Sequence, residues 1–340
     1  MTDWGLVAEL MFNIKFVCLR KYLLTYFMKS SQNRIKEIDF LKCILIFLVI
    51  IFHFPNVNEQ YPNLNLWVYT FHMPGFLLIS GYFMNINRCF RQFYQTIFWF
   101  LVPYLLLESL FIFISTIVPT HNPIDHLTVS IFLDRLCLDP KSPYWYLHTI
   151  IICGSFYYAV FHWLKASTLS KLFLLGLIYW GLSYVLIPWE MGLYFTLGLL
   201  IRQSGLSFLH VFRPSLWALP VILLLATDIS TFDKGTLGGM ITVYAVISLL
   251  LACYSYLPEQ IHKWSYFFGK NSLILYLFSP LFVRVCRTFL PPYLTFDPTQ
   301  LTFLLIAFPI SVVGPISVAK ALDLLHLSRW IFGKENCIAR

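Results

Sequence analysis

Long apolar stretches separated by short polar segments dominate this chain. Ten stretches approach the roughly 20 residues that a helix needs to cross a bilayer, and Pro or Gly marks most of their ends. No run of about ten residues alternates between apolar and polar positions, which disfavours a membrane barrel. The pattern predicts helices at residues 36–54, 67–85, 95–118, 144–163, 170–187, 190–202, 215–228, 237–256, 270–290 and 300–320.

The composition gives the same answer as the pattern. Of the 340 residues, 59% are hydrophobic and only 12% are charged, well outside the range of soluble domains. We therefore predict an all-α integral membrane protein with a single bundle of about ten transmembrane helices. Residues 34–322 form the predicted transmembrane domain. Residues 1–33 are expected to be a cytoplasmic or interfacial segment, and residues 323–340 a cytoplasmic tail.

The basic residues are distributed unevenly between the two sides of the predicted bundle. With the N-terminus in the cytoplasm, 18 of the 24 Lys and Arg lie on the inner side and five on the outer side, and Lys42 lies within the first span. This asymmetry predicts that both termini are cytoplasmic and that the number of spans is even. It also accounts for the net charge of +8, so the expected partner is the lipid bilayer and not nucleic acid. The eight cysteines show no metal-type spacing, and no metal is expected.

Lys42 and His53 lie at the two ends of the first predicted span. Eleven residues of helix correspond to about 16 Å and about three turns, so both side chains should share one face. His72 enters the second span from the outer side and should lie at a depth similar to that of His53. Two histidines near the outer face suggest proton chemistry. The alternatives are a boundary role for Lys42, a packed interface for His53 and helix-entry geometry for His72.

Five basic residues, Lys36 among them, are expected to gather on the inner side, where they would suit phosphate groups. Arg88 and Arg91 are three residues apart and are predicted to share a helix face. Lys42 and Arg34 approach the same side from the first span. The alternative for Arg88 and Arg91 is that they only obey the inside preference of basic residues.

Several other polar or aromatic residues are candidates for the site. Glu108 lies within the third span, where a carboxylate needs a partner, and it would support a histidine or neutralise a basic group. Trp145 and Tyr146 would form a platform for a sugar or belong to the aromatic belt. Arg284 and Arg287 would hold an acidic sugar or a carrier phosphate, or would anchor their helix at the interface.

Five segments in order resemble those of the membrane-bound acyltransferase family 3. The first resembles the family's pattern of a basic residue, ten residues and a histidine, here Lys42 and His53. The second, "FHMPGFLLISGYF", contains His72 and Ser80-Gly81. The segments are residues 34–54, 71–83, 88–104, 142–147 and 268–280. Two departures are Lys42, where many members have Arg, and Ser279-Pro280, where the family commonly has His-Pro.

The resemblance implies an O-acyltransferase, most simply an O-acetyltransferase of the bacterial inner membrane. It implies cytoplasmic acetyl-CoA as the acyl donor, gripped by Arg34, Lys42, Arg88 and Arg91. The acceptor would be a lipopolysaccharide, a surface polysaccharide or a lipid-linked sugar, bound near Trp145, Tyr146 and Arg284. His53, His72 and Glu108 would carry the chemistry. The alternative function is a transporter or flippase of glycan intermediates, which would use the same intramembrane residues for proton coupling.

Overall fold

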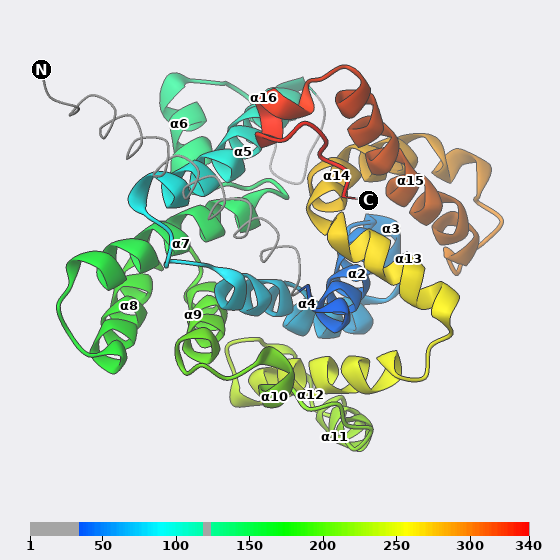
Figure 1. The fold of residues 1–340 in the computed structure, drawn as a ribbon. Coiled ribbons are helices and arrows are strands. Elements are labelled where there is room, and N and C mark those ends of the chain that lie inside the picture. Colours follow the sequence, from blue (N-terminus) through cyan, green and yellow to red (C-terminus); the bar gives the residue numbers. More distant parts are fainter. Residues whose placement is uncertain (1–33, 118–123, 340) are drawn as a thin grey trace, which may run out of the picture. The chain divides into compact units, whose positions relative to one another are not determined.

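The computed structural model of the chain describes residues 34–117 and 124–339, and all of its regular elements there are helices (Figure 1). The chain divides into two units, residues 1–37 and residues 38–340. The account below concerns the second unit. The predicted interfacial segment, residues 1–33, lies outside the described residues.

A helix occupies each of the ten stretches that the pattern predicted. These helices are α2 (Lys36–Ile51), α4 (Pro62–Phe83), α5 (Phe90–Ile117), α7 (Trp145–Trp163), α8 (Thr168–Leu182), α9 (Trp189–Gln203), α11 (Ala218–Leu225), α12 (Leu237–Tyr254), α14 (Ser272–Phe289) and α15 (Leu301–Leu324). Shorter helices join them: α3 (Pro55–Gln60), α6 (Val129–Cys137), α10 (Phe208–Val211), α13 (Glu259–Lys270) and α16 (Ser328–Phe332). The all-helical fold class is therefore confirmed for the described residues.

Within residues 34–117 and 124–339, four helices are both long enough and apolar enough to cross a membrane, namely α5, α12, α14 and α15. The other helices are shorter or carry more polar residues. Helix α11, for example, has eight residues, too few for a full crossing. The chain is thus a helical membrane protein, and the number of ten spans stays a prediction.

The first predicted span ends earlier than expected. Helix α2 stops at Ile51, and Pro55 starts α3. A residue before proline avoids the helical region, and Phe54 is accordingly extended, with φ −84° and ψ 112°. His53 consequently lies in a turn between two helices. The expectation that one continuous helix aligns it with Lys42 is wrong, because the proline breaks the helix first.

Helices α4 and α9 pack against each other with their backbones in close approach. A Cβ atom on Gly81 would overlap the carbonyl oxygen of Phe195, and one on Gly198 would overlap that of Leu78. Small residues allow such contacts between membrane helices. Gly81 is therefore a packing residue of this helix contact.

Candidate active site

The two histidines of the candidate site share one arrangement. His53 Nδ1 lies 2.5 Å from the carbonyl oxygen of Val49, and His72 Nδ1 lies 2.7 Å from that of Val68. A carbonyl oxygen only accepts, so Nδ1 is the donor in both rings. The neutral imidazole then has its lone pair on Nε2, which is the form of a general base.

Tyr69 lies between the two histidines. Its ring centroid is 6.4 Å from that of His53, in a stacked arrangement, and 4.7 Å from that of His72, edge-on. The Tyr69 hydroxyl donates to the carbonyl oxygen of Phe52 at 3.1 Å, which fixes the ring against the turn that holds His53. His72 is fully buried, and its Nε2 has no hydrogen-bond partner among the described residues.

Both histidines line a cavity of about 480 Å³. Trp145 and Arg284, two of the predicted acceptor-binding residues, line it as well. Among the polar residues of its wall that the sequence interpretation did not single out are Asn58, Tyr69, Lys234 and Tyr276. The position of Tyr276 within the fifth motif was the only available signal, because residues far apart in the chain meet here.

Two smaller cavities continue from this one toward Lys42. A cavity of about 80 Å³ shares Met73 and Tyr276 with the large cavity. It shares Lys42 and Ser80 with a third cavity of about 260 Å³, which Arg88 also lines. The three cavities thus form a series, with a cation pair at one end and the histidines at the other.

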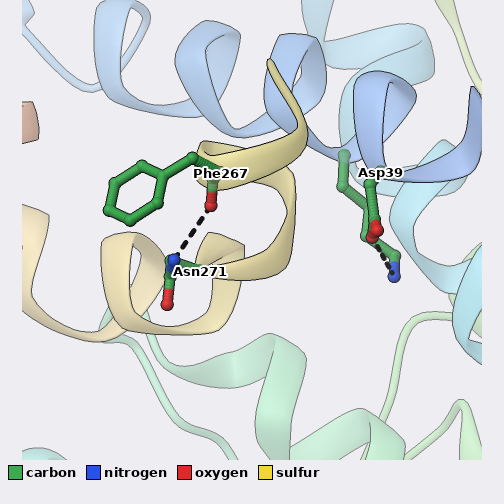
Figure 2. Close-up of polar contacts among 4 residues, drawn as sticks. Asp39, Phe267 and Asn271 are labelled. Atoms are coloured by element: carbon green, nitrogen blue, oxygen red, sulfur yellow. Dashed lines mark hydrogen bonds and ion pairs between the residues drawn. The ribbon is translucent and has the colours of Figure 1, made fainter. Parts of the chain in front are cut away.

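Lys42 is held in place by Asp39. The ammonium lies 3.4 Å from the carboxylate of Asp39, which is buried (Figure 2). It also lies 5.1 Å from the centroid of the Phe83 ring. Gly269 allows this region to pack tightly, because a Cβ atom there would overlap the carbonyl oxygen of Asp39.

The predicted inner cluster is only partly assembled. Arg88 lines the cavity with Lys42 and donates to Thr96 Oγ1 at 2.8 Å. Arg91 is exposed and is not among the lining residues. The expected shared helix face is wrong because α5 begins at Phe90, so Arg88 precedes the helix. Arg34 belongs to the first unit, and its role rests on the sequence alone.

Glu108 is buried and accepts a hydrogen bond from Ser142 Oγ, which itself accepts from the backbone N–H of Tyr144 at 2.9 Å. Within the described part of the chain, no hydrogen bond joins Glu108 to either histidine. The carboxylate instead orients the segment that starts α7 and lines the large cavity.

Tyr146 belongs to the same segment, at the start of α7, and lines a cavity together with Lys42. Its hydroxyl lies 2.7 Å from Ser80 Oγ, and its ring contacts that of Tyr276, with centroids 5.3 Å apart. Tyr146 lines the small middle cavity, whereas Trp145 lines the large one. The two predicted acceptor-binding aromatics therefore face different parts of the series.

The fifth motif holds the segment at the start of α7 through reciprocal hydrogen bonds. The Tyr276 hydroxyl donates to the carbonyl oxygen of Pro143 at 2.7 Å, and the Tyr144 hydroxyl donates to that of Leu277 at 3.1 Å. Asn271 has a different role from the helix capping that its position suggests. Its amide nitrogen donates to the carbonyl oxygens of Phe267 (Figure 2) and Ala339, and its side-chain oxygen accepts from Ala339 N–H.

One of three comparisons with known proteins identifies a family for the chain. A family model described as an acyltransferase domain matches residues 35–320. The comparisons with curated proteins and with solved structures each gave no match. The matched range covers most of the chain. It includes all three cavities and, apart from residue 34, all five motifs. The chain therefore belongs to the acyltransferase 3 family.

Proposed function

We propose that this protein is an O-acetyltransferase that moves an acetyl group from acetyl-CoA to a hydroxyl of a surface polysaccharide, a lipopolysaccharide or a lipid-linked sugar. The observation that carries this proposal is the series of three cavities between the cations Lys42 and Arg88 and the histidines. Phosphates bind well to Lys and Arg, and the thioester of CoA lies at the far end of a long, narrow arm.

The chain's own residues supply the rest of the reaction. Lys42 and Arg88 hold the phosphates of the donor. His53 Nε2 takes the proton of the sugar hydroxyl while the sugar oxygen attacks the thioester carbonyl. The C–S bond of the resulting tetrahedral intermediate then breaks, and the proton passes to the departing thiolate. His72 is the second candidate base, and Glu108 acts through Ser142 as a positioning residue.

We also propose the membrane setting that the sequence indicated. The protein lies in the bacterial inner membrane with about ten spans and both termini in the cytoplasm. The donor then enters from the side of Lys42 and Arg88, and the acceptor from the side of His53. The transmembrane acyltransferase domain comprises residues 34–322. Arg34 is proposed as a donor-binding residue on the strength of the sequence alone.

The test measures acetyl transfer by the purified full chain in nanodiscs. Acetyl-CoA labelled in the acetyl group is supplied with the surface-glycan fraction, and mass spectrometry follows acetylation of the glycan. We expect His53→Ala to lower the rate by roughly 10²–10⁴-fold, the usual contribution of a general base. The control is His210→Ala, since His210 is exposed and lines none of the three cavities. Transfer at the normal rate in His53→Ala would refute the proposed role.

A second arm tests the donor end with the same assay. Arg88→Ala should raise KM for acetyl-CoA at least fivefold, because one charge-assisted contact to a phosphate is lost. The matched control is Arg213→Ala, which removes an exposed arginine outside the cavities. An unchanged KM in Arg88→Ala would exclude this cavity as the donor site.

A further inference from the structure

Arg88, the arginine at the cation end of the cavity series, does not belong to a helix. It lies between α4, which ends at Phe83, and α5, which begins at Phe90. Its guanidinium is held by Thr96, since Nη1 donates to Thr96 Oγ1 at 2.8 Å. Its backbone lies outside the hydrogen-bond ladders of both helices, so other groups must fix its position.

The hydroxyl of Tyr158, on α7, contacts the backbone of Arg88. It lies 3.3 Å from the carbonyl oxygen of Arg88 and 3.2 Å from Nε2 of His162. A hydroxyl group has one proton to donate, and a carbonyl oxygen only accepts. The Tyr158 hydroxyl therefore donates to Arg88, and in this arrangement the Nε2–H of His162 donates to the Tyr158 oxygen. The result is a chain of two hydrogen bonds that ends on the backbone of Arg88.

The ring of Tyr158 is stacked against two other rings. The Phe93 ring of α5 lies 4.2 Å from it, with 24° between the planes, and the His162 ring lies 4.1 Å from it, with 15° between the planes. Two rings at these distances cannot occupy the same face, so they cover opposite faces of Tyr158. Tyr158 is also 1% exposed. Its hydroxyl is therefore held firmly at the carbonyl oxygen of Arg88.

Tyr158 acts on the cavity of about 260 Å³ from outside it. Arg88, Phe93 and Thr96 line this cavity, and Tyr158 is not among the lining residues. A molecule in the cavity thus meets Arg88 directly and meets Tyr158 only through its effect on Arg88.

We propose that Tyr158 is a positioning residue for the acyl donor, because its hydroxyl fixes the segment from which the Arg88 guanidinium reaches the donor phosphates. This inference rests on the proposed transferase function and adds a residue to its donor site. Binding is strongest when the binding group is held in place before the ligand arrives. The expected effect is therefore on the affinity for the donor. The transfer step takes place in the large cavity, which Tyr158 does not line.

The test variant is Tyr158→Phe, which removes the hydroxyl and keeps the stacked ring. In the nanodisc assay it should raise KM for acetyl-CoA about two- to fivefold, because one hydrogen bond is lost. The value of kcat at saturating donor should stay at the wild-type level. An unchanged KM, or a loss confined to kcat, would overturn the proposal.

The matched control is Tyr157→Phe on the same helix. Tyr157 is buried, its hydroxyl accepts from the side-chain amide of Gln203, and it lines none of the three cavities. Its loss should leave KM for acetyl-CoA unchanged, and thermal unfolding reports the stability of both variants. An equal rise of KM in Tyr157→Phe would show a general structural effect and overturn the proposal.

A double-variant cycle tests whether Tyr158 acts through Arg88. In the Arg88→Ala background, Tyr158→Phe should cause no further rise in KM, because the guanidinium that it positions is gone. A rise of the same size in both backgrounds would refute the positioning role.

Binding of CoA separates this inference from the proposed function. Titration calorimetry on the full chain in nanodiscs should show Kd for CoA about two- to fivefold higher in Tyr158→Phe and unchanged in His53→Ala. If the wild type and Tyr158→Phe bind CoA equally well, the positioning role is refuted and the proposed function stands. If the wild type does not bind CoA, the donor site is refuted together with this inference.

Discussion

At His53 the hydrogen bond of the ring follows from the end of a helix. The last carbonyl groups of α2 lack helical partners, and the backbone N–H of His53 donates to Ile50, 3.3 Å away. The carbonyl oxygen of Val49 is left for His53 Nδ1. This hydrogen bond fixes the tautomer of the ring and leaves Nε2 for proton transfer, as the equivalent bond of His72 does inside α4.

Glu108 offers a test of whether its charge or its position matters. Glu108→Gln should keep acetyl transfer within about threefold of the wild type, because an amide oxygen still accepts from Ser142 Oγ. Glu108→Ala should lower stability by about 1–3 kcal/mol, because Ser142 loses a buried partner. Transfer rates and thermal unfolding of both variants provide the measurement. A loss of activity in Glu108→Gln as large as in Glu108→Ala would show that the carboxylate itself is required.

At the level of the helix, the second motif lies on α4 where α4 packs against α9. Gly81 and Gly198 bring the two backbones together, and Ser80, next to Gly81, thereby lies where it reaches Tyr146. Ser80 is thus part of a packed hydrogen-bonded pair with Tyr146. Because Ser80 directly precedes Gly81 in the motif, the close helix contact at Gly81 also positions the Ser80 hydroxyl.

The close helix contact predicts the effect of adding one methyl group. Gly81→Ala should destabilise the protein by about 1–3 kcal/mol, because the Cβ atom meets backbone that cannot move without separating the helices. Gly176→Ala in α8 is the matched control, since no atom lies within 4 Å of a Cβ atom built there. It should leave stability unchanged or raise it by up to about 1 kcal/mol. Thermal unfolding in detergent distinguishes the two, and equal melting temperatures would contradict the packing argument.

For the whole molecule, the series of cavities links segments that are far apart in the chain. The cation end combines α2 with the segment before α5, and the histidine end combines the α2–α3 turn with α4, α7 and α14. The direction of transfer across the membrane depends on which end faces the cytoplasm.

Two native cysteines report this orientation. Cys89 lies between α4 and α5, Cys137 ends α6, and both are exposed. In variants that retain one of these cysteines, a membrane-impermeant maleimide should label Cys137 in intact spheroplasts. It should label Cys89 only after permeabilisation, because the segment with Arg88 and Arg91 is predicted to be cytoplasmic. Labelling of Cys89 from outside would reverse the proposed topology.

The sequence predicted the positions of the ten helices. The structure places both motif histidines on one cavity, and their catalytic roles stay predictions. Apolar runs and proline positions are local properties, and local properties are readable from sequence. The first helix was predicted to extend to residue 54, but it ends at Ile51. Pro55 disrupts the helix several residues before its own position. The shared face of Arg88 and Arg91 was missed because the start of a helix depends on the turn before it.

By itself, the sequence determined that this is a helical membrane protein with the motifs of an acyltransferase and with charged or titratable residues at Lys42, His53 and His72. Only the tertiary structure decided which residues meet. In the folded chain, Glu108 accepts a hydrogen bond from Ser142. Lys234 lines the same cavity as the two histidines, whereas Arg91 does not line the cavity that contains Lys42 and Arg88. The physical reason is that periodicity specifies which side of a helix is apolar, whereas the neighbour of that side is set by packing between segments that are distant in the chain.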